Sequence, residues 1–486
     1  MLQPARKILT NVFISAEGNK LKLVDIIFDD RIKQVVPLLN SQTEWSEISN
    51  KEKLKAFIEK LPPISQYRNS KIYDGNFLFL MPGAIDPHVH FNTPGFEFRD
   101  DFKHASTAAA YGGVTTVIDM PCTSIPPVTS VENLNIKLSA LEGKSLVDYC
   151  LWGGISGNDF DEQKDLKMQV DELVKAGVAG FKTYLISGMD SFRDLTPERL
   201  LIAAEYVKEL NKPIAVHAED KNRINTRSQK LIANGETGWK AFVKARDSEA
   251  EARAISTLIE IASKCDCRFH IVHLSSKAGL ELIRKAKAEA LKFSTETCPH
   301  YLAFTQNDFN DKIISNYLKT SPPVKTDVDK KALWEGLRDG TISFVTTDHA
   351  GCNPAVEKSS KNFWEVYSGI PGVEHRVPFL LSEGFLKGRL TLEQTVKLLS
   401  TNASEYFGIV DKGSLDVGKD ADFALINMWS SEKIKSNNMH SKGKYTPFEG
   451  REFSAIVEQT FLRGRVIMDR RNELEEQVCF GEYIKI

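Results

Sequence analysis

Short apolar stretches alternate with amphipathic ones through the middle of the chain, from about residue 81 to about residue 408. GVTTVIDM is followed by VENLNIKLSALEG, and CRFHIVHLSS is followed by KAGLELIRKAKAEA. Apolar runs of about four to eight residues favour buried strands, and a 3.6-residue apolar period favours amphipathic helices. This alternation predicts an α/β fold with a parallel sheet whose helices cover its outer face.

The two ends of the chain have a different pattern. Residues 6–37 contain the β-branched stretches KILTNVFIS, LKLVDIIF and IKQVVPL, and KIYDGNFLFL, ADFALIN and IVEQTFLRGRVIMD are similar. Such stretches between polar breaks are typical of short strands. Within residues 41–70, WSEISNKEKLKAFIEKL has a helical period and precedes Pro62-Pro63. We therefore expect both ends to form one small β-domain that carries a helical insertion.

The chain has 486 residues, which exceeds one ordinary compact domain. It suits a (β/α)₈ barrel of roughly 250 to 400 residues with a smaller accessory domain. We expect the barrel at residues 81–410 and the small domain at residues 1–80 and 411–486. An open doubly wound sheet is the alternative. The closed barrel is favoured because several predicted strands end in polar, potentially ligating residues, and barrel strand ends converge on one site.

Charge and composition indicate a small-molecule partner. The 63 basic and 65 acidic residues leave a formal net charge of −2, so neither nucleic acid nor an anionic membrane is an expected partner. The N-terminal sequence lacks the apolar core of a signal peptide, and no apolar run approaches the roughly 20 residues that span a bilayer. Seven cysteines without a CxxC pair predict neither a disulfide framework nor a zinc ribbon. We expect a cytoplasmic protein, and a homo-oligomer (dimer or tetramer).

The strongest local signal is the motif Asp86-Pro-His88-Val-His90. In a strand, residues i and i+2 point to the same side, so His88 and His90 can offer two imidazoles to one metal ion. Imidazole is a preferred ligand of zinc and similar divalent ions. Two ordinary histidines near a turn are the commoner explanation when such a motif stands alone.

Three further positions weaken that explanation. His217 in KPIAVHAED and His273 in FHIVHLSS each end an apolar, strand-like run, and Asp348 follows ISFVTT in the same way. Any one of these could be a capping or hydrogen-bonding residue. Together with the motif at residues 86–90 they place four of the ten histidines at such ends, which predicts a metal site.

Lys182, in VAGFKTYL, is expected near the end of a buried strand. A buried charged amine without a partner is costly, and many lysines avoid this cost by extending to the surface. The alternative is that the Lys182 amine carries CO₂ as a carbamate. A carbamate is an anion with two oxygens and can bridge two metal ions, whereas an ammonium group would repel them.

Taken together, these motifs resemble the amidohydrolase superfamily, in particular its branch of dihydroorotases, allantoinases and hydantoinases. The resemblance covers nearly the whole chain. It rests on PGAIDPHVHF, AAAYGGVTTVIDMP, AGFKTY, AVHAED, IVHLSS, ETCPHYL, TSPPVK, TTDHAG, GIPGVEHRVP and KGSLDVGKDADFALI. It implies a (β/α)₈ TIM-type barrel with a β-sandwich made from both chain ends.

The resemblance also implies a set of metal ligands. His88, His90 and Asp348 would hold one divalent ion, His217 and His273 a second, and carboxylated Lys182 would bridge them. Two Zn²⁺ ions are expected, with a shared hydroxide that attacks a cyclic amide. Asp348 would take the proton of the nucleophile and pass it to the departing ring nitrogen. Metal-free relatives that act in assembly or signalling, and mononuclear deaminases without the bridging lysine, fit this ligand set poorly.

The substrate-facing positions depart from the dihydroorotase pattern. Asn92 stands where dihydroorotases usually carry Arg, Cys122 replaces an Asn after Met-Pro, and Ala350-Gly351-Cys352 replaces Ala-Pro-His. The stretches DMPCTSIPPVTS, WGGISGN and KYTPFEGREF look more like allantoinases, whereas GIPGVEHRVP looks closer to hydantoinases. The Tyr that hydantoinases place a few residues beyond the lysine is out of register, since Tyr184 lies only two residues on and Ser187 occupies the later place.

The expected function is therefore that of an allantoinase, which converts allantoin to allantoate. A dihydroorotase is the second possibility, and a hydantoinase or dihydropyrimidinase the third. Asn92 and Cys122 either contact substrate or only fill the pocket wall. His375 or Arg376 could supply the positive charge that dihydroorotate requires. The candidate substrate contacts are Asn92, Cys122, His300, Ser321 and Cys352.

Overall fold

The computed structural model describes residues 6–61, 67, 70–472, 474 and 478–486. The N-terminal residues 1–5, where no signal peptide is expected, lie outside this part of the chain, as does the predicted helix end at Pro62-Pro63.

Parallel strands from the middle of the chain form a closed ring. Strand β9 continues after Trp152 as β10, and β15 continues after residues 346–348 as β16. Strand β16 pairs with β7 in the register His349–Val89, which closes the ring at eight strand positions. This closure confirms the barrel over the open sheet. The strands are β7 (Ala84–His90), β8 (Val114–Asp119), β9 (Asp148–Leu151), β10 (Gly153–Gly154), β11 (Phe181–Tyr184), β12 (Pro213–His217), β13 (Arg268–Ile271), β14 (Phe293–Thr297), β15 (Phe344–Val345) and β16 (His349–Ala350).

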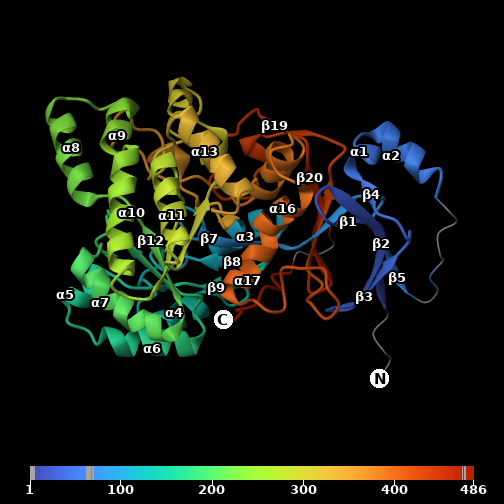
Figure 1. The fold of residues 1–486 in the computed structure, drawn as a ribbon, viewed down its shortest axis with the longest axis horizontal. Coiled ribbons are helices and arrows are strands. Elements are labelled where there is room, and N and C mark those ends of the chain that lie inside the picture. The colour runs from blue at the N-terminus through green and yellow to red at the C-terminus, as the bar shows by residue number, and fades with distance from the viewer. Residues whose placement is uncertain (1–5, 62–66, 68–69, 473, 475–477) are drawn as a thin grey trace.

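Helices between the strands surround this ring (Figure 1). The amphipathic segments named above form α4 and α11, as predicted, and serine side chains cap both N-termini: Ser130 for α4 and Ser276 for α11. Gly177 ends α6 with a φ of +96°, a conformation that glycine adopts without strain. The main helices are α3 (Phe102–Tyr111), α4 (Val131–Leu141), α6 (Leu166–Ala176), α7 (Pro197–Val207), α8 (Lys221–Ala233), α9 (Trp239–Ala245), α10 (Ser248–Ala262), α11 (Lys277–Ala288), α13 (Asp327–Arg338), α16 (Leu392–Val396) and α17 (Asn402–Phe407).

Strands from the N-terminal and C-terminal parts of the chain form one nine-stranded sheet beside the barrel (Figure 1). Strand β6 (Phe79–Pro82) pairs with β17 (Phe423–Asn427), which joins the N-terminal and C-terminal parts. Phe28, Phe423 and Phe461 pack together in the core of this sandwich domain. The expected β-sandwich from both ends is confirmed, and the domain boundaries stay a prediction. The other strands of this sheet are β1 (Lys7–Ser15), β2 (Lys20–Phe28), β3 (Ile32–Pro37), β4 (Thr43–Glu44), β5 (Lys71–Asp74), β20 (Ile456–Leu462) and β21 (Arg465–Asp469).

Two short helices, α1 (Trp45–Ile48) and α2 (Lys51–Ile58), lie where the helical insertion was expected. Asn50 caps the N-terminus of α2, and its side chain accepts a hydrogen bond from the backbone N–H of Lys53. Among the described helices, none is both long and apolar enough to cross a lipid bilayer.

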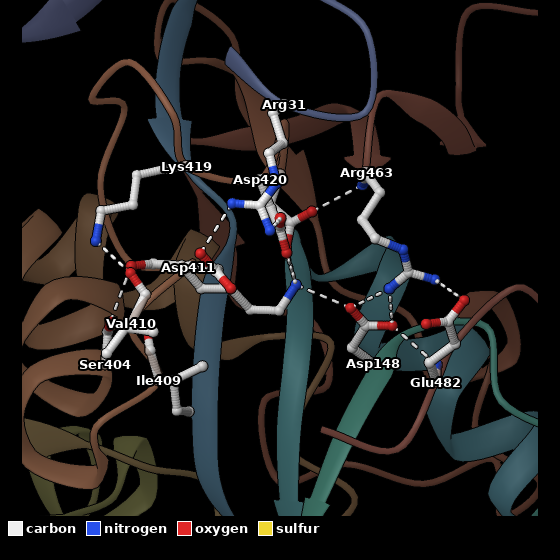
Figure 2. A network of polar contacts seen from close by, with 12 residues as sticks. Arg31, Asp148, Ser404, Ile409, Val410, Asp411, Lys419, Asp420, Arg463 and Glu482 are labelled. Atoms are coloured by element: carbon white, nitrogen blue, oxygen red, sulfur yellow. Dashed lines mark hydrogen bonds and ion pairs between the residues drawn. The ribbon is translucent and has the colours of Figure 1, made fainter. Parts of the chain in front are cut away.

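A buried ion network fastens the barrel to the sandwich domain. The Nζ atom of Lys412 lies 2.7 Å from Asp422, 2.8 Å from Asp148 and 3.1 Å from Asp420. Asp148 begins β9, and it also pairs with Arg463, near Glu482 of the C-terminal tail (Figure 2). Three segments that are distant in sequence are therefore held at one place in the structure.

Candidate metal and substrate site

The strand ends place all six predicted metal-binding residues around one cavity of about 850 Å³. Four of them lie within strands: two in β7, one in β11 and one at the end of β12. The other two, His273 and Asp348, lie in the short segments just after β13 and β15. Because parallel barrel strands all run the same way, their carboxyl ends open on one face. The six residues are His88, His90, Lys182, His217, His273 and Asp348.

The first group consists of His88, His90 and Asp348, whose ligand atoms all lie within 4.8 Å of one another. Oδ1 of Asp348 is 3.1 Å from Nε2 of His88 and 3.2 Å from Nε2 of His90. Burial opposes the charged carboxylate, but the two imidazoles hold the pKa of Asp348 well below its usual value. Two imidazoles and a carboxylate form a donor set that suits zinc.

The second group is the pair His217 and His273. Nδ1 of His217 lies 3.0 Å from Nε2 of His273, and the ring centroids are 4.7 Å apart. Burial lowers the pKa of both rings, which favours the neutral imidazole that a metal ion requires. The backbone at His273 and at Asp348 has positive φ, 40° and 48°, a costly conformation that marks functional positions.

Lys182 is fully buried, and its Nζ atom has no hydrogen-bond partner among the described residues. Burial lowers the pKa of the amine to about 8, and the charge of Asp348 partly opposes this shift. Nζ lies 4.6 Å from the centroid of the Tyr184 ring. A buried polar group without a partner is rare in native structures, so this amine fits a site that is completed by a further group.

Two buried glutamates, which the sequence analysis missed, contact the outer ring nitrogens of two of these histidines. Nδ1 of His88 contacts Oε1 of Glu296, and Nε2 of His217 lies 2.8 Å from Oε2 of Glu219. A carboxylate on one ring nitrogen fixes the tautomer and directs the other nitrogen inward. Glu219 could have been found from the sequence, because it follows His217 by two residues. Glu296 could not, since it is 208 residues from His88.

Two of the five predicted substrate contacts line the site cavity, and the other three are not among its described lining residues. Cys122 and Ser321 line the cavity, and Sγ of Cys122 lies 3.1 Å from the Tyr184 hydroxyl. The described lining does not include Asn92, His300 or Cys352. Cys352 instead contacts the Tyr445 hydroxyl at 3.2 Å. The substrate role of these residues stays a prediction. The complete set of predicted contacts is Asn92, Cys122, His300, Ser321 and Cys352.

His375 and Arg376 do not line this cavity in the described chain. Arg376 is fully buried and donates to the carbonyl oxygens of Val345 at 2.7 Å and Leu399 at 3.3 Å. His375 lines a separate cavity of about 140 Å³. Neither residue is therefore placed to offer a carboxylate in this cavity the positive charge that the sequence left possible.

Two arginines that the sequence analysis did not consider, Arg99 and Arg246, do line the site cavity. Tyr184 lines it too, although it is out of register with the hydantoinase tyrosine. Arg99 lies nine residues after His90, in the loop that leaves β7, and this position was the available signal.

Comparison with known proteins agrees with this geometry. The amidohydrolase family matches residues 79–467. The allantoinase of Bacillus licheniformis is 32% identical over 459 residues, 93% of this chain and 98% of that protein. The allantoinase of Rubrobacter xylanophilus is 33% identical over 397 residues, which cover 82% of this chain and 85% of that protein. An L-hydantoinase (dihydropyrimidinase) from Arthrobacter aurescens superposes with a TM-score of 0.87 at 27% identity, covering 99% of both chains.

Proposed function

The chain belongs to the amidohydrolase family, and we propose that it is an allantoinase, a hydrolase that opens the ring of allantoin to give allantoate. One observation carries this proposal. Six side chains suited to two metal ions line a single cavity, in a chain that matches curated allantoinases over most of its length. Hydrolysis of a cyclic amide is the reaction that both the allantoinase and the hydantoinase relatives share.

The donor atoms fit two divalent ions. His88, His90 and Asp348 would hold one ion, while His217 and His273 would hold the other. Lys182 would bridge them as a carbamate. Its buried amine lacks a partner among the described residues, and the lowered pKa leaves a fraction of the amine uncharged and able to add CO₂. We propose zinc, which prefers imidazole and carboxylate ligands. When bound, the ions supply Lewis acidity, which lowers the pKa of water and polarises a carbonyl oxygen.

Asp348 is the proposed proton carrier. Its carboxylate lies on the cavity surface, and the neighbouring His88 and His90 favour its ionised form. It can therefore accept the proton of the attacking water and return that proton to the ring nitrogen as the amide bond breaks. Glu296 and Glu219 hold the outer nitrogens of His88 and His217, so the inner nitrogens stay aimed at the cavity.

A hydantoinase, the third possibility from the sequence, becomes the second candidate, because the L-hydantoinase of Arthrobacter aurescens shares the fold over 99% of this chain. A dihydroorotase is the third. Its substrate carries a carboxylate. Asn92 and Cys122 offer that anion no positive charge, and the two arginines that line the cavity are paired with acidic side chains, Arg99 with Glu357 and Arg246 with Glu219. The arm of allantoin is a neutral ureide, whose donors and acceptors can be met by hydroxyl, amide and backbone groups.

A substrate panel tests the proposal. Purified protein, supplied with zinc and bicarbonate, is assayed with allantoin, hydantoin, dihydrouracil and dihydroorotate at one pH and one metal loading. We expect the highest kcat/KM for allantoin. Efficient turnover of dihydroorotate with none of allantoin would reject the proposal, and preference for hydantoin or dihydrouracil would favour the second candidate.

We further propose a cytoplasmic homo-oligomer, dimer or tetramer, that acts on a small molecule rather than on nucleic acid or a membrane. The seven cysteines support a reducing compartment, because all of them are free thiols in the structure. Light scattering on a size-exclusion column measures the oligomeric state directly.

A further inference from the structure

Arg99 lines the site cavity, and its guanidinium group lies beside one acidic and two aromatic side chains. Its Nε donates to Oε1 of Glu357 at 2.7 Å, and its guanidinium carbon lies 4.5 Å from the centroid of the Tyr367 ring and 5.4 Å from that of Phe96. Neither terminal nitrogen has a hydrogen-bond partner among the described residues. The guanidinium plane is thus held in place while two NH₂ groups remain available to a ligand in the cavity.

Glu357 offsets the charge of this guanidinium group. Helix α14 (Pro354–Glu357) ends at this residue, and its carboxylate is fixed through both oxygens. Oε1 contacts Arg99, and Oε2 accepts a hydrogen bond from the backbone N–H of Asn353 at 3.0 Å. The side chains of Arg99 and Glu357 are only 23% and 14% exposed, so solvent screens the pair incompletely.

Arg246 is the other guanidinium group that lines the cavity in the described chain, and it is also paired. Its partner is Glu219, which contacts the proposed ligand His217. The role of Arg246 is therefore tied to the metal group. Arg99 contacts none of the proposed ligands, which leaves it free to recognise a substituent of the substrate ring.

We propose that Arg99 binds the carbonyl oxygen of the substrate's ureido arm, and that Glu357 makes this position select a neutral arm over a carboxylate. The inference rests on the proposed function, since it names the group that recognises the arm of the ring. Two N–H groups of a planar fork suit a carbonyl oxygen, which brings no charge of its own. A carboxylate would need a net positive partner when it leaves water, and Glu357 cancels that charge.

Three hydantoins with one ring and different arms separate recognition of the arm from ring chemistry. Allantoin carries a ureido arm, hydantoin carries none, and hydantoin-5-acetate carries a carboxylate. We expect Arg99→Met to lower kcat/KM for allantoin about ten- to a hundredfold more than for hydantoin, the range for a hydrogen bond to a charged group. Arg99→Lys keeps the charge without the fork, and we expect it to lose a smaller part of this discrimination.

Glu357→Gln tests the charge itself, because the amide oxygen can still accept from Nε of Arg99. We expect kcat/KM for hydantoin-5-acetate, relative to that for allantoin, to rise about tenfold. Glu365→Gln is the matched control. Glu365 is an exposed glutamate in a neighbouring segment and contacts Ser360 and Asn362, so the substrate ratio should stay at the wild-type value.

Equal losses for allantoin and hydantoin in both Arg99 variants would overturn the role of Arg99 and leave it a support for the cavity wall. A wild-type substrate ratio in Glu357→Gln would overturn the role of Glu357. If the wild-type enzyme hydrolyses none of the three hydantoins, the proposed function fails, and binding decides the inference. Thermal shifts with hydantoin-5-acetate should then be larger for Glu357→Gln than for the wild type, and equal shifts would reject it.

Discussion

Glu296 and His88 form a hydrogen bond inside the barrel, in which Nδ1 of the histidine donates to Oε1 of the glutamate. This contact turns Nε2 of the same ring toward Asp348, 3.1 Å away. The second oxygen of Glu296 lies 3.0 Å from Nε2 of His270, so the carboxylate is held from both sides. Burial opposes its charge, yet the two histidines lower the pKa of Glu296 far below its usual value. The glutamate therefore fixes the tautomer and the direction of a proposed metal ligand.

Glu296→Gln should weaken metal binding and turnover about ten- to a hundredfold, the usual cost of losing such an outer contact. Titration against a chelator measures the metal affinity, and kcat measures the activity. Glu374→Gln is a matched control, because Glu374 is a buried glutamate that contacts His440 at 2.9 Å outside the site cavity. Equal effects of the two substitutions would show that Glu296 matters only for folding.

Metal content follows from the two ligand groups. His88, His90 and Asp348 form one group, and His217 and His273 form the other, so we expect about two divalent ions per chain, with zinc the most abundant. Elemental analysis of protein prepared with metal and bicarbonate measures this number. A reproducible maximum of one ion at full activity would contradict the two-metal site.

Lys182→Ala should lose metal and nearly all turnover while the barrel still folds. The reason is that the buried amine has no partner in the described chain and is proposed to bridge the ions as a carbamate. Circular dichroism and the thermal midpoint report the fold, and elemental analysis reports the metal. Short carboxylic acids should restore part of the activity by supplying a bridging carboxylate. Wild-type activity without them would remove Lys182 from the mechanism.

Asp348→Asn should lower kcat about 10²- to 10⁴-fold, the usual contribution of a positioned acid–base group, and loss of a metal contact should add to this. The amide keeps an oxygen near His88 and His90 but accepts no proton at neutral pH. Steady-state kinetics on metal-loaded protein measure the effect, with the unfolding midpoint as the control for stability. A decrease below tenfold would mean that another residue carries the proton.

Lys412→Met should destabilise the fold, because it leaves Asp148, Asp420 and Asp422 facing one another without the ammonium group. Breaking a buried pair by removing one partner costs about 3 to 5 kcal/mol. Burial opposes the charge of Lys412, but these carboxylates raise its pKa above the usual value. The expected loss is measured by denaturant unfolding at neutral pH.

The same variant should recover stability in acid. Burial raises the pKa of Asp422 even with Lys412 present, and removal of the lysine raises it further. A carboxyl group whose pKa is higher in the folded state than in the unfolded state stabilises the fold at low pH, and this contribution is lost as the pH rises through the folded-state pKa. The difference from the wild type should therefore shrink from pH 8 to pH 5. A difference that is independent of pH would show that lost packing, rather than charge, explains the effect.

Much of the fold could be predicted from local sequence patterns. The alternation of apolar runs with amphipathic segments predicts parallel strands and outer helices, because strand and helix periods bury different faces. The spacing of His88 and His90 places both rings on one side of a strand. The remaining ligands lie in or just after β11, β12, β13 and β15. These relations depend on neighbours in sequence, and the direction of parallel strands then brings them together at one face.

The contacts that tune the site are decided by the tertiary structure. Glu296 reaches His88 across 208 residues, and Glu357 reaches Arg99 across 258. Arg376 lies within the motif GIPGVEHRVP and was a possible positive charge for the site, yet its guanidinium group is buried against Val345 and Leu399. Residue type and spacing showed which side chains could bind a metal ion. Which charges face the substrate and which are neutralised depends on distances between loops that only packing fixes, because electrostatic energy varies with separation and burial rather than with order along the chain.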